Sequence, residues 1–303
     1  MEEFQEHRHK LPPEAFVIAP DPEPEPSDPV DEKTWTELVW LTDDVSIRTG
    51  EHHGSDLREA VSWWGDWLSL VLDVQALSTD PRADPLSDAC LVVTDEFQAS
   101  IHAVLVGLYR QAIGDLRSAL EAVAAAAYFR AVADAAGYAR WADGEDDGEL
   151  RPSVVRRRLH SSPPFDQLSQ EGLDLWGKDG RATTLYRLLS GFTHGRPYFV
   201  AAGGQRLPST NVGLWGGSNG PVYEARSMSL WRGIFFEAAA VVLLLTGLSE
   251  PRLAGIPKPT SRPYLEFLGE CMHRAGTERD WTVAERFLSS VAHKAMGSEE
   301  STR

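Results

Sequence analysis

The chain has 303 residues, a formal charge of −16 at neutral pH and 42% hydrophobic residues. This apolar fraction excludes a wholly disordered chain, and two cysteines exclude a scaffold built on disulfides. The first residues, Met1 to Glu6, lack the basic and apolar segments of a secretory signal. We therefore expect a globular protein of the reducing cytoplasm.

The negative charge is concentrated at the amino terminus. Residues 1–44 hold thirteen acidic and three basic residues, a net charge of −10, so the rest of the chain carries only −6. Seven prolines fall within residues 11–30, where they prevent a helix or a sheet ladder. We predict a disordered, acidic, proline-rich tail over residues 1–45 and one helical domain over residues 46–298. Such a tail could also mask a basic surface of the same chain.

Apolar residues at helical spacing predict a series of helices after the tail. The predicted helices cover residues 55–77, 87–142, 153–160, 182–193, 225–248 and 280–296. The segment from Pro81 to Pro85 should separate the first two, and Gly107 or Gly114 should bend or divide the longest. The most apolar stretch, residues 233–248, contains Glu237 and is shorter than the roughly 20 residues needed to cross a bilayer. It predicts a buried core helix and no membrane association.

A glycine-rich segment over residues 203–222 interrupts the helical pattern. Its six glycines and two prolines predict a long loop, which could hold a short hairpin around Val212–Trp215. Strand signals are few elsewhere in the chain. The sequence therefore predicts an all-α fold, a helical bundle with this Gly-rich loop or short hairpin as an insertion.

Several common catalytic motifs are absent from the sequence. It contains no P-loop, dinucleotide fingerprint, nucleophile elbow or paired CxxC motif. His52 and His53 are adjacent and would point in different directions from a helix, so a surface cluster is favoured over a metal site. Cys90 and Cys271 are expected to be packing residues. We expect no metal and no cofactor.

One region of the acidic chain is basic. Residues 151–206 hold nine basic and four acidic residues, a local charge of +5. Salt screens charges that lie more than about 10 Å away, so a basic region can bind phosphate within an acidic protein. The count alone slightly favours a solvated basic face without a ligand.

The basic region contains a pair of residues that could act on RNA. Arg187 and His194 are seven residues apart, about two helical turns, so both side chains can emerge on one helix face. The imidazole could move a proton at the 2′-hydroxyl or the leaving oxygen, while the guanidinium holds a non-bridging phosphate oxygen. Arg181 and Arg196 would add phosphate-binding charge.

The spacing alone is weak evidence, because it recurs elsewhere in the chain. Similar arginine–histidine pairs occur at Arg48/His53 and at Arg286/His293. The first of these lies in a polar lead-in, and the second lies on an ordinary amphipathic helix. The basic context therefore favours Arg187/His194.

The segment Tyr186–Ser190, leading to His194-Gly195, and the segment Gly107–Glu121 resemble uncharacterised bacterial helical proteins. These proteins are related to the HEPN (higher eukaryotes and prokaryotes nucleotide-binding) superfamily, and the resemblance covers about residues 90–250. It implies a helical bundle, often dimeric, with a metal-independent endoribonuclease site. By this resemblance the arginine and histidine described above form the catalytic pair, in a toxin or defence factor.

The resemblance also suggests substrate-binding residues. Arg117 and Glu121 are four residues apart and can pair along one helix face, where a structural ion pair is the simpler interpretation. In the functional interpretation, Arg117 shares the phosphate pocket and Glu121 orients the catalytic pair. Tyr186 and Ser190 would complete the substrate-binding set, although tyrosines at helical spacing are more often core residues.

The chain departs from the family pattern in one position. Active members usually carry a polar residue directly after the arginine, and this chain has Leu188 there. The alternative function is a noncatalytic helical module that binds a nucleotide or a protein partner. The expected partners are thus RNA or a nucleotide, and a second copy of the chain in a homodimer.

Overall fold

The computed structural model describes residues 31–81, 84–143, 150–193, 198–200, 206–208, 223, 225–257, 259–260 and 262–300. The described helices are α2 (Glu32–Trp35), the π-helical η2 (Thr36–Trp40), α3 (Leu41–Leu77), α4 (Pro85–Leu105), α5 (Tyr109–Val132), α6 (Ala135–Ala142), α7 (Pro152–His160), α8 (Phe165–Gln170), α9 (Arg181–Thr193), α10 (Ala225–Ser249), the 3-10 helix η3 (Pro251–Gly255), α11 (Tyr264–Arg274) and α12 (Glu278–Glu300). The predicted all-α helical bundle is therefore confirmed.

Two short strands are the β-structure in the described ranges. Strands β1 (Tyr198–Val200) and β2 (Arg206–Pro208) pair antiparallel, with Phe199 opposite Leu207. The hairpin expected around Val212–Trp215 and most of the predicted Gly-rich loop lie outside the described residues.

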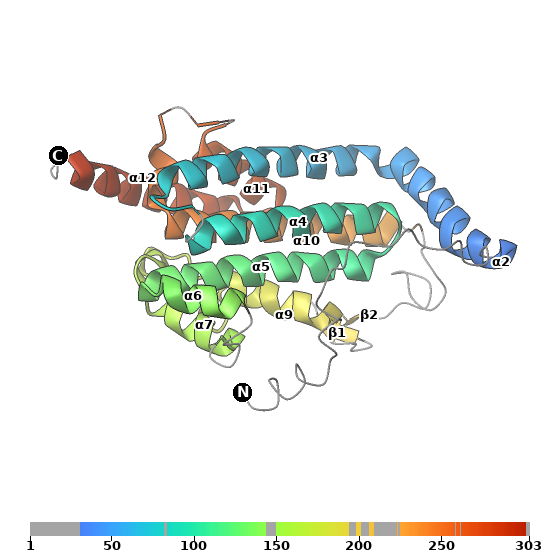
Figure 1. The fold of residues 1–303 in the computed structure, drawn as a ribbon, viewed down its shortest axis with the longest axis horizontal. Helices are drawn as coiled ribbons and strands as arrows, with labels where there is room; N and C mark the ends of the chain where they lie inside the picture. Colours follow the sequence, from blue (N-terminus) through green and yellow to red (C-terminus); the bar gives the residue numbers. More distant parts are fainter. Residues whose placement is uncertain are drawn as a thin grey trace, which may run out of the picture.

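The long helices α3, α4 and α5 lie side by side, and α10 packs behind them (Figure 1). Aromatic rings fill the space between α3, α4 and α10. The ring of Trp63 lies 4.3 Å from that of Phe97, which meets Phe235 edge-on at 5.0 Å. Such pairs stabilise a core beyond the area that they bury. Cys271 accepts a hydrogen bond from the Trp63 indole at 3.0 Å, and it is a buried, free thiol, in line with its predicted packing role.

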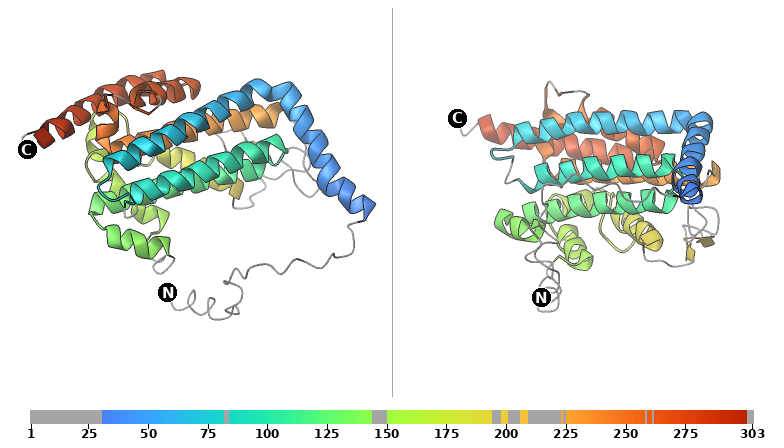
Figure 2. Two further views of the ribbon diagram at one scale, coloured as in Figure 1. Left: turned by 45° about the horizontal axis from the view of Figure 1, so that its top comes forward. Right: turned by 45° about the vertical axis from the view of Figure 1, so that its right-hand side comes forward.

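Helical structure begins within residues 1–45, the segment that was expected to be a disordered tail. Helix α2 starts at Glu32, inside the expected 1–45 tail, because the Asp31 carboxylate caps it by accepting from the Thr34 N–H at 3.0 Å. The helical path then continues through α3, which bends at His53 (φ −127°, ψ 21°) and carries its first part away from the bundle (Figure 2). In η2, which precedes α3, Leu38 and Trp40 are exposed. The apolar residues of this segment therefore do not lie on one buried face, and helical periodicity gave no signal for it in the sequence.

The long predicted helix over residues 87–142 is divided into α4, α5 and α6. Gly107 makes the first break with φ 79°, and its N–H donates to the Val104 carbonyl at 3.1 Å. Glycine adopts this left-handed conformation without strain, so it can end α4 and allow α5 to fold back alongside. Gly114, the other candidate, lies inside α5.

The apolar helix α10 is the centre of the bundle. It is long and apolar enough to cross a membrane, but 72% of its most apolar window is buried inside the protein, as expected for a core helix. The Trp231 indole donates to Ser100 Oγ at 3.0 Å, and the Ser100 hydroxyl donates to the Ala112 carbonyl at 2.7 Å. This buried chain of hydrogen bonds joins α10, α4 and α5.

A charged cluster fastens α11 to α3. Glu270 accepts hydrogen bonds from Arg262 at 2.5 Å and from Arg274 at 2.6 Å, and Arg274 also pairs with Glu59 of α3 at 2.5 Å. Partial burial opposes the charged form of Glu270, but the two arginines outweigh it and lower its pKa below the ordinary 4.5. This carboxylate therefore stays ionised in the folded protein down to more acidic conditions than a free glutamate.

Candidate functional site

Arg117 joins α5 to α9 through a network of hydrogen bonds. Its guanidinium donates to Glu121 Oε1 at 3.0 Å, to the Tyr186 hydroxyl at 3.1 Å and to the Thr193 hydroxyl. The Tyr186 hydroxyl in turn donates to Glu121 Oε1 at 3.0 Å, and the guanidinium carbon lies 5.2 Å from the centre of the Tyr186 ring. The structure thus brings together three of the predicted site residues, Arg117, Glu121 and Tyr186.

The charges of this network compensate one another. Burial opposes the charge of Arg117, whose side chain is only 16% exposed, but Glu121 and Tyr186 raise its pKa overall. Burial and the Glu121 carboxylate both raise the pKa of Tyr186, so the phenol keeps its proton and acts as a donor. The arrangement favours a positioning role for Arg117, which holds Thr193 at the end of α9.

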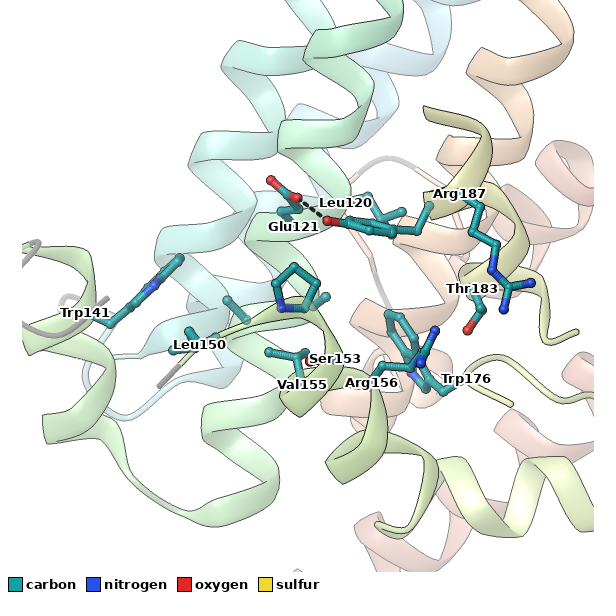
Figure 3. Close-up of a pocket in the computed structure, with 14 residues that line it drawn as sticks. Leu120, Glu121, Trp141, Leu150, Ser153, Val155, Arg156, Trp176, Thr183 and Arg187 are labelled. Carbon is teal, nitrogen blue, oxygen red and sulfur yellow. Dashed lines mark hydrogen bonds between the residues drawn. The ribbon is translucent and has the colours of Figure 1, made fainter. Parts of the chain in front are cut away.

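A cavity of about 620 Å³ lies between α5, α6, α7 and α9 and includes Trp176 in its wall (Figure 3). Much of its lining is apolar and includes Trp141, Leu150 and Val155 together with Ala124 and Ala125 of α5. The polar lining residues are Glu121, Ser153, Arg156, Trp176, Thr183, Tyr186 and Arg187. The cavity has the size and composition of a small-molecule site.

Arg187 is exposed at the edge of this cavity. In the described ranges it has no ion-pair partner, and the same holds for Arg156 of α7. The arginines of the two competing pairs differ, since Arg48 binds Asp44 at 3.0 Å and Arg286 binds Glu171 at 2.8 Å. Of the three candidate arginines, Arg187 is thus the one without an ion pair in the described residues.

Arg181 does not fit the predicted role of phosphate-binding residue. Its guanidinium forms two hydrogen bonds with Glu237 of α10, at 2.8 and 2.7 Å, and a third contact with Asp280 of α12 at 3.4 Å. The Arg181 side chain is only 7% exposed. Two carboxylates already balance its charge, so the structure favours a structural role in fastening α9 to α10 and α12.

The remaining predicted residues are placed only in part. His194 and Arg196 lie outside the described residues, directly after the end of α9. The Ser190 hydroxyl is buried, and it has no hydrogen-bond partner within the described part of the chain. The side chain of Leu188 packs against the core, which explains an apolar residue at this position.

The sequence did not indicate four residues that shape the site. Thr193 binds Arg117, while Arg156, Trp176 and Thr183 line the cavity. Arg156 lay in the basic region already noted, but Trp176 and Thr183 belong to no motif or periodic pattern. Their place in the wall follows from tertiary packing alone.

Family models, curated proteins and solved structures give no match to this chain. The fold and the site define an all-α helical-bundle protein with a ligand-sized cavity beside α9. The resemblance to the HEPN superfamily therefore rests on the sequence segments that carry it.

Proposed function

We propose that the chain is a cytoplasmic endoribonuclease of HEPN-like type, with Arg187 and His194 as its catalytic pair. The observation that supports this proposal is the exposed guanidinium of Arg187, which has no ion-pair partner in the described residues. A free guanidinium can bind a phosphate oxygen with charge-assisted hydrogen bonds. The paired arginines of the other two candidate motifs would first have to break an ion pair.

The proposed reaction is an internal transfer at phosphorus. The 2′-oxygen of the RNA bonds to phosphorus while the bond to the 5′-oxygen breaks, which leaves a cyclic phosphate and a free 5′-hydroxyl. His194 takes the proton of the 2′-hydroxyl, and the imidazolium then protonates the leaving 5′-oxygen. Arg187 stabilises the charge that develops on the non-bridging oxygens. This mechanism requires no metal and no cofactor.

The Arg117 network supports the placement of this pair. Thr193, which immediately precedes His194, is bound by Arg117, and Tyr186, which precedes Arg187, is bound by both Arg117 and Glu121. Catalytic groups must be held in a narrow range of positions, and residues that fix their neighbours do so. In this proposal Arg117 and Glu121 are positioning residues.

Cleavage of single-stranded and structured RNA in the presence of a chelator tests the proposal. We expect cleavage by the wild-type protein and its loss in Arg187→Gln and His194→Ala. Arg157→Gln is the matched control. It removes the same positive charge from an exposed arginine of α7 that does not line the cavity. Equal cleavage by wild type and His194→Ala, or no cleavage by either, contradicts the proposal. Binding without cleavage that depends on Arg187 would instead support the noncatalytic nucleotide-binding alternative.

The proposal includes a homodimer, which exposed apolar residues on α3 and α4 support. Val61, Leu68 and Leu72 on α3 and Leu91 on α4 are all exposed. The three residues of α3 are spaced by seven and four positions and so share one helix face, and exposed apolar faces are typical of interfaces. Leu72→Glu should lower the molar mass measured by light scattering to that of a monomer, whereas Val154→Glu on α7 should leave it unchanged. A wild-type protein that is already monomeric contradicts the dimer.

A further inference from the structure

Two buried polar groups in the cavity wall lack a hydrogen-bond partner. The side chains belong to Trp176 and Thr183, residues that are only 6% and 2% exposed. Within the described part of the chain, neither Trp176 Nε1 nor Thr183 Oγ1 finds a partner, and both residues line the 620 Å³ cavity. Most buried polar groups in proteins are satisfied, so two beside one cavity point to an acceptor that comes from outside. Both atoms are almost fully covered by protein, so a ligand reaches them once these side chains shift slightly.

The backbone holds these two residues rigidly. The Asp174 carboxylate accepts from the backbone N–H of Trp176 at 3.1 Å and of Gly177 at 2.8 Å. The Thr183 N–H donates to the Leu175 carbonyl at 3.1 Å. Gly180 closes this turn, since a Cβ there would lie 2.6 Å from the Leu175 backbone. The backbone of both residues is thus fixed before any ligand arrives, and only the side chains have to move on binding.

The cavity has a polar end and an apolar end. Figure 3 shows Trp176, Thr183, Arg156 and Arg187 together on one side. Trp141 and Leu150 lie on the other side. The lining also includes the apolar side chains of Val155, Ala124 and Ala125. At the polar end, Arg156 and Arg187 are two cationic groups that have no ion pair in the described ranges. Together with the two buried donors of Trp176 and Thr183, they suit an anionic headgroup.

We propose that this cavity binds a small organic anion with an apolar body, an acyl or aryl chain that ends in a carboxylate or a phosphate. The headgroup accepts hydrogen bonds from Trp176 Nε1 and Thr183 Oγ1 and pairs with Arg156 and Arg187. The body lies against Trp141, Leu150 and Val155. A ligand of this kind suits a cavity of about 620 Å³, which lies within the usual range for small-molecule sites.

The apolar end argues against a nucleotide in the same cavity. A nucleobase carries ring nitrogens and exocyclic groups that need hydrogen-bond partners when they leave water. Leu150, Val155 and Ala125 supply no side-chain donor or acceptor, and Trp141 supplies only the donor of its indole. A hydrocarbon or an unsubstituted aromatic ring meets no such cost there.

Calorimetric titration with decanoate, decyl phosphate and decanol, below their micelle-forming concentrations, tests this inference on the full chain. We expect both anions to bind at least tenfold more tightly than decanol, and the tighter of the two identifies the headgroup. Thr183→Val should weaken anion binding about tenfold or more, because a hydrogen bond to a charged group is lost. Thr184→Val is the matched control, since Thr184 is exposed and outside the cavity lining.

The stability of the same variant separates a ligand-binding role from a structural one. Because the Thr183 hydroxyl has no partner within the described ranges, Thr183→Val should leave the thermal midpoint of the ligand-free protein unchanged or raise it. A structural role would give a lower midpoint and unchanged binding, which would overturn the inference. Equal binding of decanol and the anions, or adenosine monophosphate binding more tightly than either, would also overturn it. The titration requires no RNA cleavage, so a failure of the proposed ribonuclease activity leaves this test intact.

Discussion

Replacement of Arg181 by glutamine should destabilise the protein without weakening its interaction with phosphate. The substitution would leave Glu237 without its two short hydrogen bonds and remove the contact with Asp280. Loss of one partner of a fully buried ion pair costs about 3–5 kcal/mol. The carboxylate side chains are 25% and 38% exposed, so partial rehydration should reduce the cost to about 2 kcal/mol. In a chain of this size that corresponds to a fall of about 3 °C in the thermal midpoint.

Denaturation by urea, followed by circular dichroism, measures this cost for Arg181→Gln, Glu237→Gln and the double variant. The double variant should regain at least half of the stability lost in Arg181→Gln, because no unpaired carboxylate remains on α10. Arg187→Gln, six residues along the same helix, should keep wild-type stability because its guanidinium is exposed. Wild-type stability of Arg181→Gln together with weaker RNA binding would refute the structural role and restore Arg181 to the phosphate site.

Three further predictions concern the bundle. The pKa of Glu270 in the folded protein lies below the ordinary 4.5, so its contribution to stability is complete above pH 4.5 and is lost as the pH falls through the folded pKa. Glu270→Gln should therefore flatten the acid side of the curve of stability against pH, measured by urea denaturation. Ser100→Ala should cost about 1–3 kcal/mol in the free energy of unfolding, because the buried Trp231 indole loses its acceptor. Gly107→Ala should cost about 1–2 kcal/mol, since φ is 79° there, and Gly114→Ala, inside α5, should show no such loss in the same denaturation experiment.

Helical periodicity predicted the elements that have one buried face. Helix α7 begins one residue before the predicted 153–160, and α9 begins one residue before the predicted 182–193. Helix α11 was missed although Phe267, Leu268, Cys271 and Met272 are buried at helical spacing, so its signal was present in the sequence. The early start at Glu32 could not be predicted in this way, because the exposed first turns bury no consistent face.

The site was predictable only where its contacts are local. Arg117 and Glu121 are four residues apart on one helix, and their pairing follows from that spacing. The hydrogen bond from Arg117 to Tyr186 spans 69 residues, and nothing in the local sequence marks it. The same limit explains Arg181, whose partner Glu237 is 56 residues away and appeared in the sequence only as an interruption of an apolar helix.

Helix α9 explains why these features meet in one place. Its first residue is held by Glu237 of α10, and its last residue, Thr193, is held by Arg117 of α5. Between these two anchors, Thr183 and Arg187 are four residues apart and so share the face that lines the cavity. A helix fixed at both ends can present its central residues without losing order on binding. The ion pair at its first residue and the hydrogen bond at its last residue thus position Arg187, which has no ion pair in the described residues, for the proposed binding role.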